Sequence, residues 1–531
     1  MKTQVLIVGG GPVGSTLALD LAARGIEVIV AERNPPGQIP GVKCNHVAAR
    51  TMEIFRRLGI AQAIRDTGLP ADHPNDVAFR TSVAGIEFAR IMIPCRRDRY
   101  TDKDGPDGWW PTPEPPHRIN QIYLDPLLAG FARDHPLISY LNNMEIAGFS
   151  QSEDGVVAEI AGTHQLVHAE YLIGCDGPSS RVRSLIGARL TGDAVIGRTQ
   201  STYIRAPGLA ARMQAAPAWS TQVMNPRRSA NMFAVDGRET WVIHNYLRPE
   251  ETEFSDVDAD GCIRAILGCD HPYEVITSED WIGRRMLAGR FRDRRAFICG
   301  DAAHLWVPFA GYGMNAGIAD AMNLSWMLAG VLNGWADPRI LDAHEAERWP
   351  ITEQVSKFAM STSLSLARAR AEVPADIEDN AATRVAVGEL MLKLHTPQFC
   401  CGGLNFGSYY DRSPIVAHDG EEPPPYTMDR FTSSTVPGCR TPHVWLEDGR
   451  SLYDAMGPDF CLLRFDRATD VSGLTEAAAL RGLPMHVLDL APVDVYRQKL
   501  VLSRPDQHIA WRGNAEPGNP LTLIDKIRGA A

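Results

Sequence analysis

The chain has 531 residues, 44% of them hydrophobic and 22% charged, with a formal net charge of −11. This length exceeds the roughly 250 to 300 residues that one hydrophobic core supports, so we expect two or three domains. The composition excludes a fibrous or mainly disordered chain. The negative charge disfavours binding to nucleic acids or anionic membranes, because both carry negative charge themselves.

The N-terminus and the cysteines indicate a cytoplasmic protein. Residues 5–8 are apolar but are followed at once by glycines, which is not the pattern of a secretory signal, and no apolar run reaches the roughly 20 residues of a membrane span. The ten cysteines are scattered without a CxxC pair or zinc-type spacing. We therefore expect reduced thiols, no metal and no membrane partner.

The first sixty residues read as a strand, a glycine turn, a helix and a second strand. Residues 5–8 form the first apolar run, the turn follows at residues 9–14, helix spacing begins at Ser15, and the second strand ends at Glu32. In this pattern Gly9 permits the tight turn, Gly11 lets a pyrophosphate approach, and Gly14 lets helix and strand pack closely.

Glu32 adds a preference among nucleotides. Its carboxylate is placed to accept from ribose hydroxyls, and it would repel a 2′-phosphate. The segment therefore predicts a site for FAD or NAD.

Two later motifs favour FAD over NAD. Residues 171–177 form a buried strand that ends in Asp176 and Gly177, and residues 295–304 form another that leads to Asp301. A glycine-rich loop at residues 311–315 then precedes a helix expected over residues 316–328. Two carboxylates that converge from distant strands exceed what a plain NAD site needs.

With these three motifs in this order, the chain resembles the class A FAD-dependent aromatic monooxygenases of the para-hydroxybenzoate hydroxylase fold, in particular the phenol and dichlorophenol hydroxylase branch. The resemblance implies an α/β protein: a Rossmann-type FAD-binding domain interleaved with a β-sheet substrate domain, followed by a thioredoxin-like α/β domain. The expected FAD-binding parts are residues 1–75, 117–190 and 280–350, and the substrate-binding parts are residues 76–116 and 191–279. A helical segment and linker would occupy 351–430 and the C-terminal domain 431–531.

The resemblance also assigns cofactor contacts. The ADP half would lie on the first glycine motif. The DG motif (Asp176-Gly177) would lie by the pyrophosphate, and Asp301 of the GD motif (Gly300-Asp301) would bond the ribityl or ribose hydroxyls. Residues 313–315 would present backbone N–H groups to the flavin. Lys43 stands where the family usually has Arg, and Tyr312 where it often has Gln. The expected cofactor residues are Gly9, Gly11, Gly14, Glu32, Arg33, Lys43, Gln121, Asp176, Gly177, Asp301, Gly313, Met314 and Asn315.

The chemistry implied by the resemblance is hydroxylation of a phenolic or similarly electron-rich aromatic. NADPH or NADH reduces the flavin transiently, O2 adds, and a C4a-hydroperoxyflavin transfers oxygen. A base should help to ionise the phenol. Asn45 stands at the place of the family's acid and cannot accept a proton, so the neighbouring His46 is the candidate base, although a structural role is the alternative. Pro308, after the GD motif, completes the expected catalytic residues.

Substrate contacts are expected from two alternating segments, residues 201–205 and 241–246. Core or sheet-surface roles for these side chains are equally consistent with the pattern. The candidates are Tyr203, His244 and Tyr246, together with Tyr312 from the glycine loop.

Other functions on the same fold remain open. A flavin halogenase lacks support because its WxWxIP motif is missing, and an epoxidase is a further alternative. A non-catalytic carrier such as a GDP-dissociation inhibitor would not need intact DG and GD motifs. The C-terminal domain has no CxxC pair, so we expect it to be structural or to support a homodimer.

Overall fold

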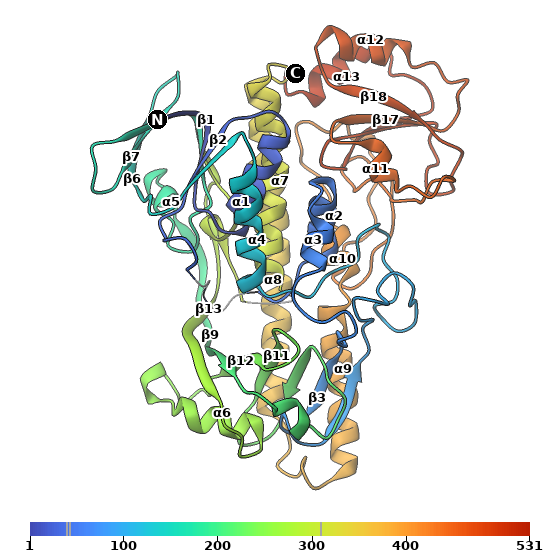
Figure 1. The fold of residues 1–531 in the computed structure, drawn as a ribbon. Coiled ribbons are helices and arrows are strands. Elements are labelled where there is room, and N and C mark those ends of the chain that lie inside the picture. The colour runs from blue at the N-terminus through green and yellow to red at the C-terminus, as the bar shows by residue number, and fades with distance from the viewer. Residues whose placement is uncertain (39–40, 42–43, 308–310) are drawn as a thin grey trace.

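Three sheets and the helices packed on them make up the protein (Figure 1). The structure is a computed structural model and describes residues 1–38, 41, 44–307 and 311–531. Lys43 and Pro308, both expected at the functional site, lie outside the described residues.

The first sheet has a parallel core in the order β15-β8-β1-β2-β5, with β14 at one edge. Its strands read as continuous apolar runs because both faces are covered, one by helices and the other largely by strands β6 and β7. The antiparallel pair β6 and β7 joins it through β8. The strands are β1 Lys2–Val8, β2 Val28–Ala31, β5 Ile138–Leu141, β6 Ile146–Gln151, β7 Val156–Ile160, β8 Leu166–Gly174, β14 Arg292–Asp293 and β15 Ala296–Ile298.

The second sheet has the order β16-β13-β9-β12-β11-β10-β3-β4 and is largely antiparallel. The long strands β9 and β13 pair along most of their length and run from the first sheet to the second. The strands are β3 Val77–Arg80, β4 Glu87–Ile91, β9 Leu190–Arg205, β10 Ser220–Val223, β11 Ala230–Ala234, β12 Thr240–Tyr246, β13 Glu274–Ala288 and β16 His304–Leu305.

Two expected domain boundaries fall inside continuous elements. The division at residues 279 and 280 falls inside β13, and the division at residues 350 and 351 falls inside α8 (Asp342–Ala371). Both elements are continuous through these points because they connect the two halves of the molecule. The helix expected over residues 316–328 is also longer, since α7 spans Tyr312–Leu332.

A layer of helices covers one face of the first sheet. α1, α4 and α7 lie side by side over one face, where α1 and α7 contact each other extensively (Figure 1). The long helix α8 continues from this layer down to the second sheet, where α9 packs against β4. The helices up to this point are α1 Pro12–Ala23, α2 Ala49–Arg57, α3 Ala61–Arg65, α4 Gln121–Asp134, α5 Arg181–Leu185, α6 Ala259–Leu267, α7, α8, α9 Ala381–Phe399 and α10 Gly402–Phe406.

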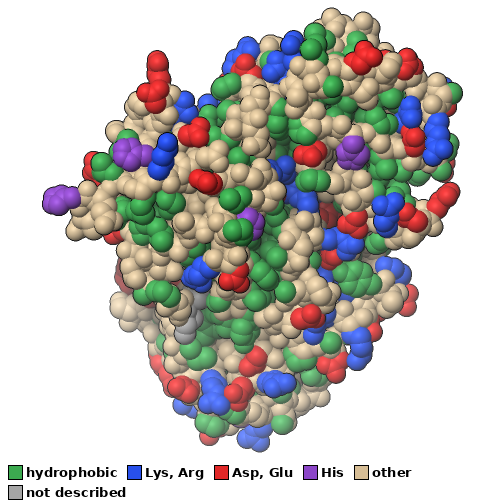
Figure 2. Space-filling view, turned by 45° about the horizontal axis from the view of Figure 1, so that its top comes forward, with side chains coloured by type: hydrophobic (Ala, Val, Ile, Leu, Met, Phe, Trp, Pro, Cys, Tyr) green, Lys and Arg blue, Asp and Glu red, His purple; other side chains and the backbone are tan. Residues whose placement is uncertain are grey.

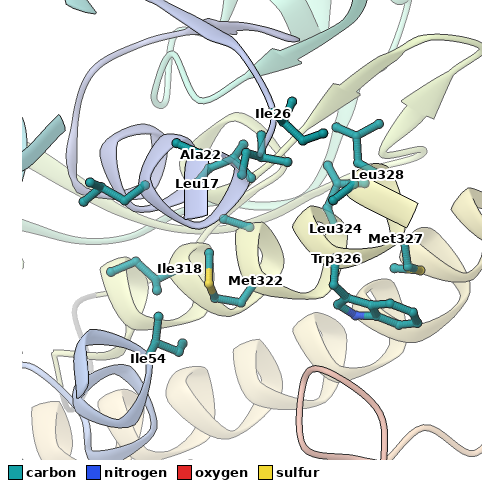
Figure 3. Packing of buried hydrophobic residues seen from close by; sticks show 14 of the residues in the cluster. Leu17, Ala22, Ile26, Ile54, Ile318, Met322, Leu324, Trp326, Met327 and Leu328 are labelled. Atoms are coloured by element: carbon teal, nitrogen blue, oxygen red, sulfur yellow. The ribbon is translucent and has the colours of Figure 1, made fainter. Parts of the chain in front are cut away.

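The interface between α1 and α7 forms the main core. Leu17 and Ala22 of α1 face Ile318, Met322 and Leu324 of α7 (Figure 3). Apolar burial contributes roughly 25 cal/mol per Å², so this large interface fixes α7 against the first glycine motif.

The C-terminal domain is a four-stranded sheet, in the order β18-β17-β19-β20, with three helices. It docks on the rest of the chain through buried ion pairs: Arg504 Nη1 lies 2.6 Å from Glu347 Oε1 of α8, and Arg440 pairs with Glu53 of α2. Its elements are α11 Leu452–Met456, β17 Phe460–Arg464, α12 Ser472–Leu480, β18 Met485–Asp489, β19 Leu500–Ser503, β20 Ile509–Gly513 and α13 Pro520–Ile527.

Basic and acidic side chains are interspersed on the face shown in Figure 2. This mixture accords with the net charge of −11 and with an ordinary solvated surface.

Candidate active site

One cavity of about 1990 Å³ connects the first and second sheets. At one end it is lined by the glycine turn after β1 and by Glu32 after β2, and at the other by aromatic side chains that include Trp219 and Phe399. The carboxyl ends of parallel strands are where open α/β sheets bind their ligands. The two ends therefore differ in chemistry, and we describe the first as the dinucleotide end and the second as the aromatic end.

The glycines at the dinucleotide end fit a bound pyrophosphate. A Cβ on Gly9 would lie 2.3 Å from the Cys175 carbonyl oxygen, and one on Gly14 would lie 2.0 Å from the Gly9 carbonyl oxygen. Gly11, by contrast, has open space where its Cβ would be. Gly11 is also the N-cap of α1, and within the described chain no side chain caps that helix. The helix therefore presents N–H donors and its positive end to the cavity.

Glu32 is held in place by backbone donors. Its carboxylate accepts from Gly10 N and from Asn34 N, each at 2.8 Å, and it lines the cavity together with Arg33. A carboxylate has about four acceptor positions, so Glu32 retains the capacity to accept from ribose hydroxyls. This end of the cavity thus fits the adenosine half of FAD.

A buried carboxylate, that of Asp320, holds the GD motif (Gly300-Asp301) in position. Asp320 Oδ2 accepts from Gly300 N at 3.1 Å and lies 2.6 Å from His304 Nε2, while its other oxygen accepts from Arg348 Nε at 2.8 Å. Burial opposes ionisation of Asp320, but His304 and Arg348 outweigh it and hold the pKa of the carboxyl well below its usual range. Asp301, the next residue after Gly300, is exposed at the cavity.

The DG motif lines the same end. Asp176 and Gly177 both border the cavity, but the Asp176 carboxylate also caps α5, accepting from Arg181 N at 2.7 Å and from Val182 N at 3.1 Å. Asp176 therefore fixes the position of α5 in addition to bordering the expected pyrophosphate site.

The start of α7 closes the middle of the cavity. Gly311 is its N-cap with a φ of 62°, a left-handed conformation that favours glycine, and Gly313 and Met314 line the cavity. Asn315 is buried instead: its Oδ1 accepts from Ala48 N at 2.8 Å and its Nδ2 donates to His46 O at 3.1 Å. Its side chain therefore braces the cavity wall.

Gln121 has a comparable supporting contact. Its Oε1 accepts from Cys44 N at 2.9 Å, and its side chain lines the cavity. The segment that carries Asn45 and His46 is thereby anchored to α4.

The surroundings of His46 disfavour its expected role as the base that ionises the phenol. Its Nδ1 lies 2.6 Å from Arg118 Nη1, and a guanidinium only donates, so Nδ1 accepts and the proton lies on Nε2. Burial and then the Arg118 charge lower the pKa of His46 well below its ordinary value. The imidazole is therefore a neutral donor, and the expectation that its unperturbed pKa suits proton abstraction is corrected.

Asn45 belongs to a chain of hydrogen bonds. Tyr203 Oη donates to Asn120 Oδ1 at 2.6 Å, and Asn120 Nδ2 donates to Asn45 Oδ1. Asn120 Oδ1 also accepts from Ile122 N at 2.9 Å, which fixes the orientation of this amide. Tyr203 and Asn45 thus lie at opposite ends of one polar row along the cavity wall.

The other predicted substrate residues also line the cavity. His244 Nδ1 lies 2.7 Å from Ser201 Oγ, which accepts from Trp281 Nε1 at 2.9 Å, and burial lowers the pKa of His244 to about 4. Tyr246 Oη accepts from Asn231 Nδ2 at 2.8 Å. Tyr312 Oη donates to Leu404 O at 2.8 Å, so its hydroxyl is engaged with the backbone rather than directed to a substrate.

Sequence reasoning missed most of the aromatic end. Trp219 lies 4.9 Å from Phe233 and 5.9 Å from Phe399, measured between ring centroids, and Arg118 Cζ lies 3.9 Å above the Trp219 ring. These residues come from separate strands, loops and helices. No local motif marks them, because folding alone brings them together.

Among the described residues, no group of three or more His, Cys, Asp or Glu side chains is arranged to hold a metal ion. In the same part of the chain, no helix combines the length and apolar character that a bilayer crossing requires.

Comparison with known proteins agrees with this geometry. Residues 2–359 match the family described as FAD binding domain, and residues 434–530 match the family described as aromatic-ring hydroxylase, C-terminal. FAD-dependent monooxygenase apdD of Emericella nidulans is 30% identical over 96% of this chain and 87% of its own length. Phenol 2-monooxygenase of Pseudomonas sp. is 27% identical over 100% of this chain and 93% of its own length.

The solved structures include RebC, a rebeccamycin biosynthetic enzyme, soaked with chromopyrrolic acid and holding 7-carboxy-K252c. It superposes with a TM-score of 0.90 at 33% identity, covering 100% of both chains. The resemblance inferred from the three motifs is therefore confirmed, as are FAD as cofactor and the use of NAD(P)H and O2 that is typical of this family. This chain belongs to the FAD-dependent aromatic monooxygenases that combine the FAD binding domain with the aromatic-ring hydroxylase C-terminal domain.

Proposed function

We propose that this enzyme hydroxylates a phenolic aromatic with more than one ring, held at the aromatic end of the cavity while FAD occupies the dinucleotide end. The size of the cavity carries the proposal. Its volume is about 1990 Å³, whereas a pocket for one drug-sized ligand measures about 300 to 1,000 Å³. We infer that FAD, bound at the dinucleotide end, leaves the aromatic end for a second ligand larger than a single phenol ring.

The residues divide the work between the two ends. Gly9, Gly11 and Glu32 line the cavity and would hold the adenosine half of FAD, Gly14 lets α1 pack closely on the glycine turn, and the N-terminus of α7 would present its donors to the flavin. When bound, FAD supplies the redox chemistry that activates O2. The chain's own side chains bind and orient the aromatic and exclude water from it.

Ionisation of the phenol rests on charge rather than on a base within the chain. Arg118 is buried beside His46, and burial lowers its pKa only to about 10, so it remains a cation at neutral pH. His46 lines the cavity and carries its proton on Nε2, and in this proposal that N–H donates to the phenolic oxygen. A donor backed by a buried cation stabilises a phenolate and lowers the pKa of the bound phenol.

A panel of phenols of increasing size tests the proposed substrate class. The FAD-loaded enzyme is given NADPH or NADH with phenol, 2-naphthol or 2-anthrol, and O2 consumption is measured with the mass gain of one oxygen in the product. We expect kcat/KM to rise at least ~tenfold from the one-ring to the three-ring compound. Highest kcat/KM with phenol, or O2 consumption without an oxygenated product, would contradict the proposal.

A variant that fills the cavity provides the matched control. Ala367 of α8 lines the cavity and is exposed to it, so Ala367→Trp adds bulk without a clash in the core. This variant should lower kcat/KM for 2-anthrol and spare phenol. An equal loss for both compounds would indicate a general defect rather than a size limit.

A further inference from the structure

Arg370, near the end of α8, lines the cavity at its aromatic end. Its Cζ lies 4.2 Å from the centroid of the Tyr246 ring, so the guanidinium rests on an aromatic face. Across the described ranges, the structure records no hydrogen bond and no ion pair to a carboxylate for Arg370. The guanidinium is therefore positioned by stacking and is not neutralised.

Two other arginines, one that lines the cavity and one on the same helix, are paired with carboxylates. Arg228 lines the same end, and its Nη1 lies 2.7 Å from Glu251 Oε1. Arg348, also on α8, is paired with Asp320 at 2.8 Å. Burial without a compensating anion disfavours a cation. Burial accordingly lowers the pKa of Arg370, with only Tyr246 acting in the opposite direction.

His395 provides a second, independent observation at the same place. It comes from α9, is 2% exposed and lines the cavity, yet neither of its ring nitrogens has a hydrogen-bond partner among the described residues. Gln398, one turn further along α9, also lines the cavity, and its buried Oε1 has no partner among those residues either. Buried polar groups in folded proteins are normally satisfied, so these atoms indicate a missing ligand or water.

The protonation state of His395 fits a role as a neutral donor. Burial first, and then the Arg370 charge, lower its pKa to about 3. At neutral pH the imidazole therefore carries one N–H. It supplies a hydrogen bond and no further positive charge.

We propose that Arg370, with His395 beside it, forms a subsite for a carboxylate on the aromatic substrate. The proposal rests on the proposed function, because it assigns a substituent to the substrate of that same cavity. A guanidinium presents paired N–H donors that match a carboxylate, and the Tyr246 ring beneath it fits the plane of an attached aromatic. A single paired-donor cation suits a monoanion better than a dianionic phosphate.

Calorimetric titration of the FAD-loaded enzyme tests the subsite without requiring turnover. The probes are 6-hydroxy-2-naphthoic acid and its primary amide, which have nearly the same shape but differ in charge. We expect the acid to bind at least ~tenfold more tightly, since hydrogen bonds to charged groups contribute about 1.5 to 3 kcal/mol.

Four variants locate the charge that is responsible. Arg370→Gln should abolish the preference by weakening the acid and leaving the amide unchanged, and Arg370→Lys should retain part of it. Arg368→Gln, an exposed position on the same helix, is the matched control and should behave as the natural enzyme. His395→Phe should weaken binding of the acid by a smaller factor than Arg370→Gln.

Several results would overturn the subsite. They are equal affinity for the two probes in the natural enzyme, failure of both to bind, a preference that survives Arg370→Gln, or an equal loss in Arg368→Gln. A preference that survives while Arg370→Gln weakens NADPH binding in the reductive half-reaction would assign Arg370 to a cofactor phosphate instead. A clear preference for the acid without any hydroxylated product would support the subsite and count against the proposed function alone.

Discussion

The two ends of the cavity are built in different ways. At the dinucleotide end, the ligand-facing surface is mostly backbone: glycine turns, the N-termini of α1 and α7, and carboxylates such as Glu32 that backbone N–H groups hold in place. At the aromatic end it is side chains from β9, β11, β12, α8 and α9. Backbone geometry tolerates few substitutions, whereas side chains exchange freely, so we expect the first end to be rigid in its requirements and the second to set specificity.

The largest expected effect concerns the glycine turn. Gly14→Ala places a Cβ 2.0 Å from the Gly9 carbonyl oxygen, whereas Gly11→Ala meets nothing within 4 Å. Gly14→Ala should cost about 3 kcal/mol or more of stability even without cofactor, because backbone must move. Gly11→Ala should change apoprotein stability by less than about 1 kcal/mol yet weaken FAD at least ~tenfold, since its Cβ fills space that the pyrophosphate needs.

Thermal unfolding of the apoproteins and FAD titration separate the two effects. Gly11→Ala with unchanged FAD affinity would show that the pyrophosphate does not approach this residue. The expected difference between Gly14→Ala, which disturbs the backbone, and Gly11→Ala, which disturbs only FAD binding, would then be contradicted.

The second-largest expected effect concerns the buried ion pairs of Asp20 on α1. Asp20 of α1 is buried, lies 2.7 Å from Arg57 of α2 and 3.0 Å from Arg24, and accepts from Ser325 of α7. Burial opposes its ionisation, but the two arginines outweigh it and lower its pKa from 3.8 to about 2. A depressed pKa stabilises the fold above pH ~4, and this contribution, about 2.5 kcal/mol, is lost as pH falls through about 2.

Asp20→Asn should therefore reduce the free energy of unfolding at pH 7 by at least this amount and flatten its dependence between about pH 4 and 2. Urea unfolding at a series of pH values measures both. Asp154→Asn, an exposed carboxylate, is the control and should leave the slope unchanged. A slope in Asp20→Asn equal to that of the natural protein would remove Asp20 as its source.

The smallest expected effect concerns His46 and its contact with Arg118. His46→Leu removes the donor that connects Arg118 with the substrate, so the pKa of a bound phenol should rise by about one unit, equivalent to about 1.4 kcal/mol. The ultraviolet absorbance of bound phenolate, followed against pH, reports this directly. His46→Gln retains an N–H donor and should restore part of the shift.

The pH profile gives a second check on His46. The pKa of His46 lies well below its ordinary value, so His46 should not titrate near pH 6.5. The pH profiles of kcat for the natural enzyme and for His46→Gln should therefore not differ by an inflection near that pH. Such an inflection would restore His46 as a base. It would also mean that ionisation of the bound phenol depends on proton transfer to His46 rather than on the charge of Arg118.

Much of the fold follows from local pattern. The run at residues 5–8, the glycines after it and Glu32 predicted β1, α1 and β2, and the later carboxylates at Asp176 and Asp301 predicted the ends of two more strands. These features are legible because backbone turns and helix starts impose residue types at fixed spacings. Local pattern does not mark the full lengths of β13 and α8, which continue through two of the expected domain boundaries.

Sequence by itself therefore determined the nucleotide-binding topology, the flavin cofactor and the family. Only the tertiary structure decided the state of His46, whose neutral form depends on Arg118 from a segment about 70 residues away. It also decided which aromatic side chains and which unpaired cation, Arg370, meet in one cavity. The physical reason is that pKa values and cavities depend on what surrounds a group in space, and a linear spacing does not record those neighbours.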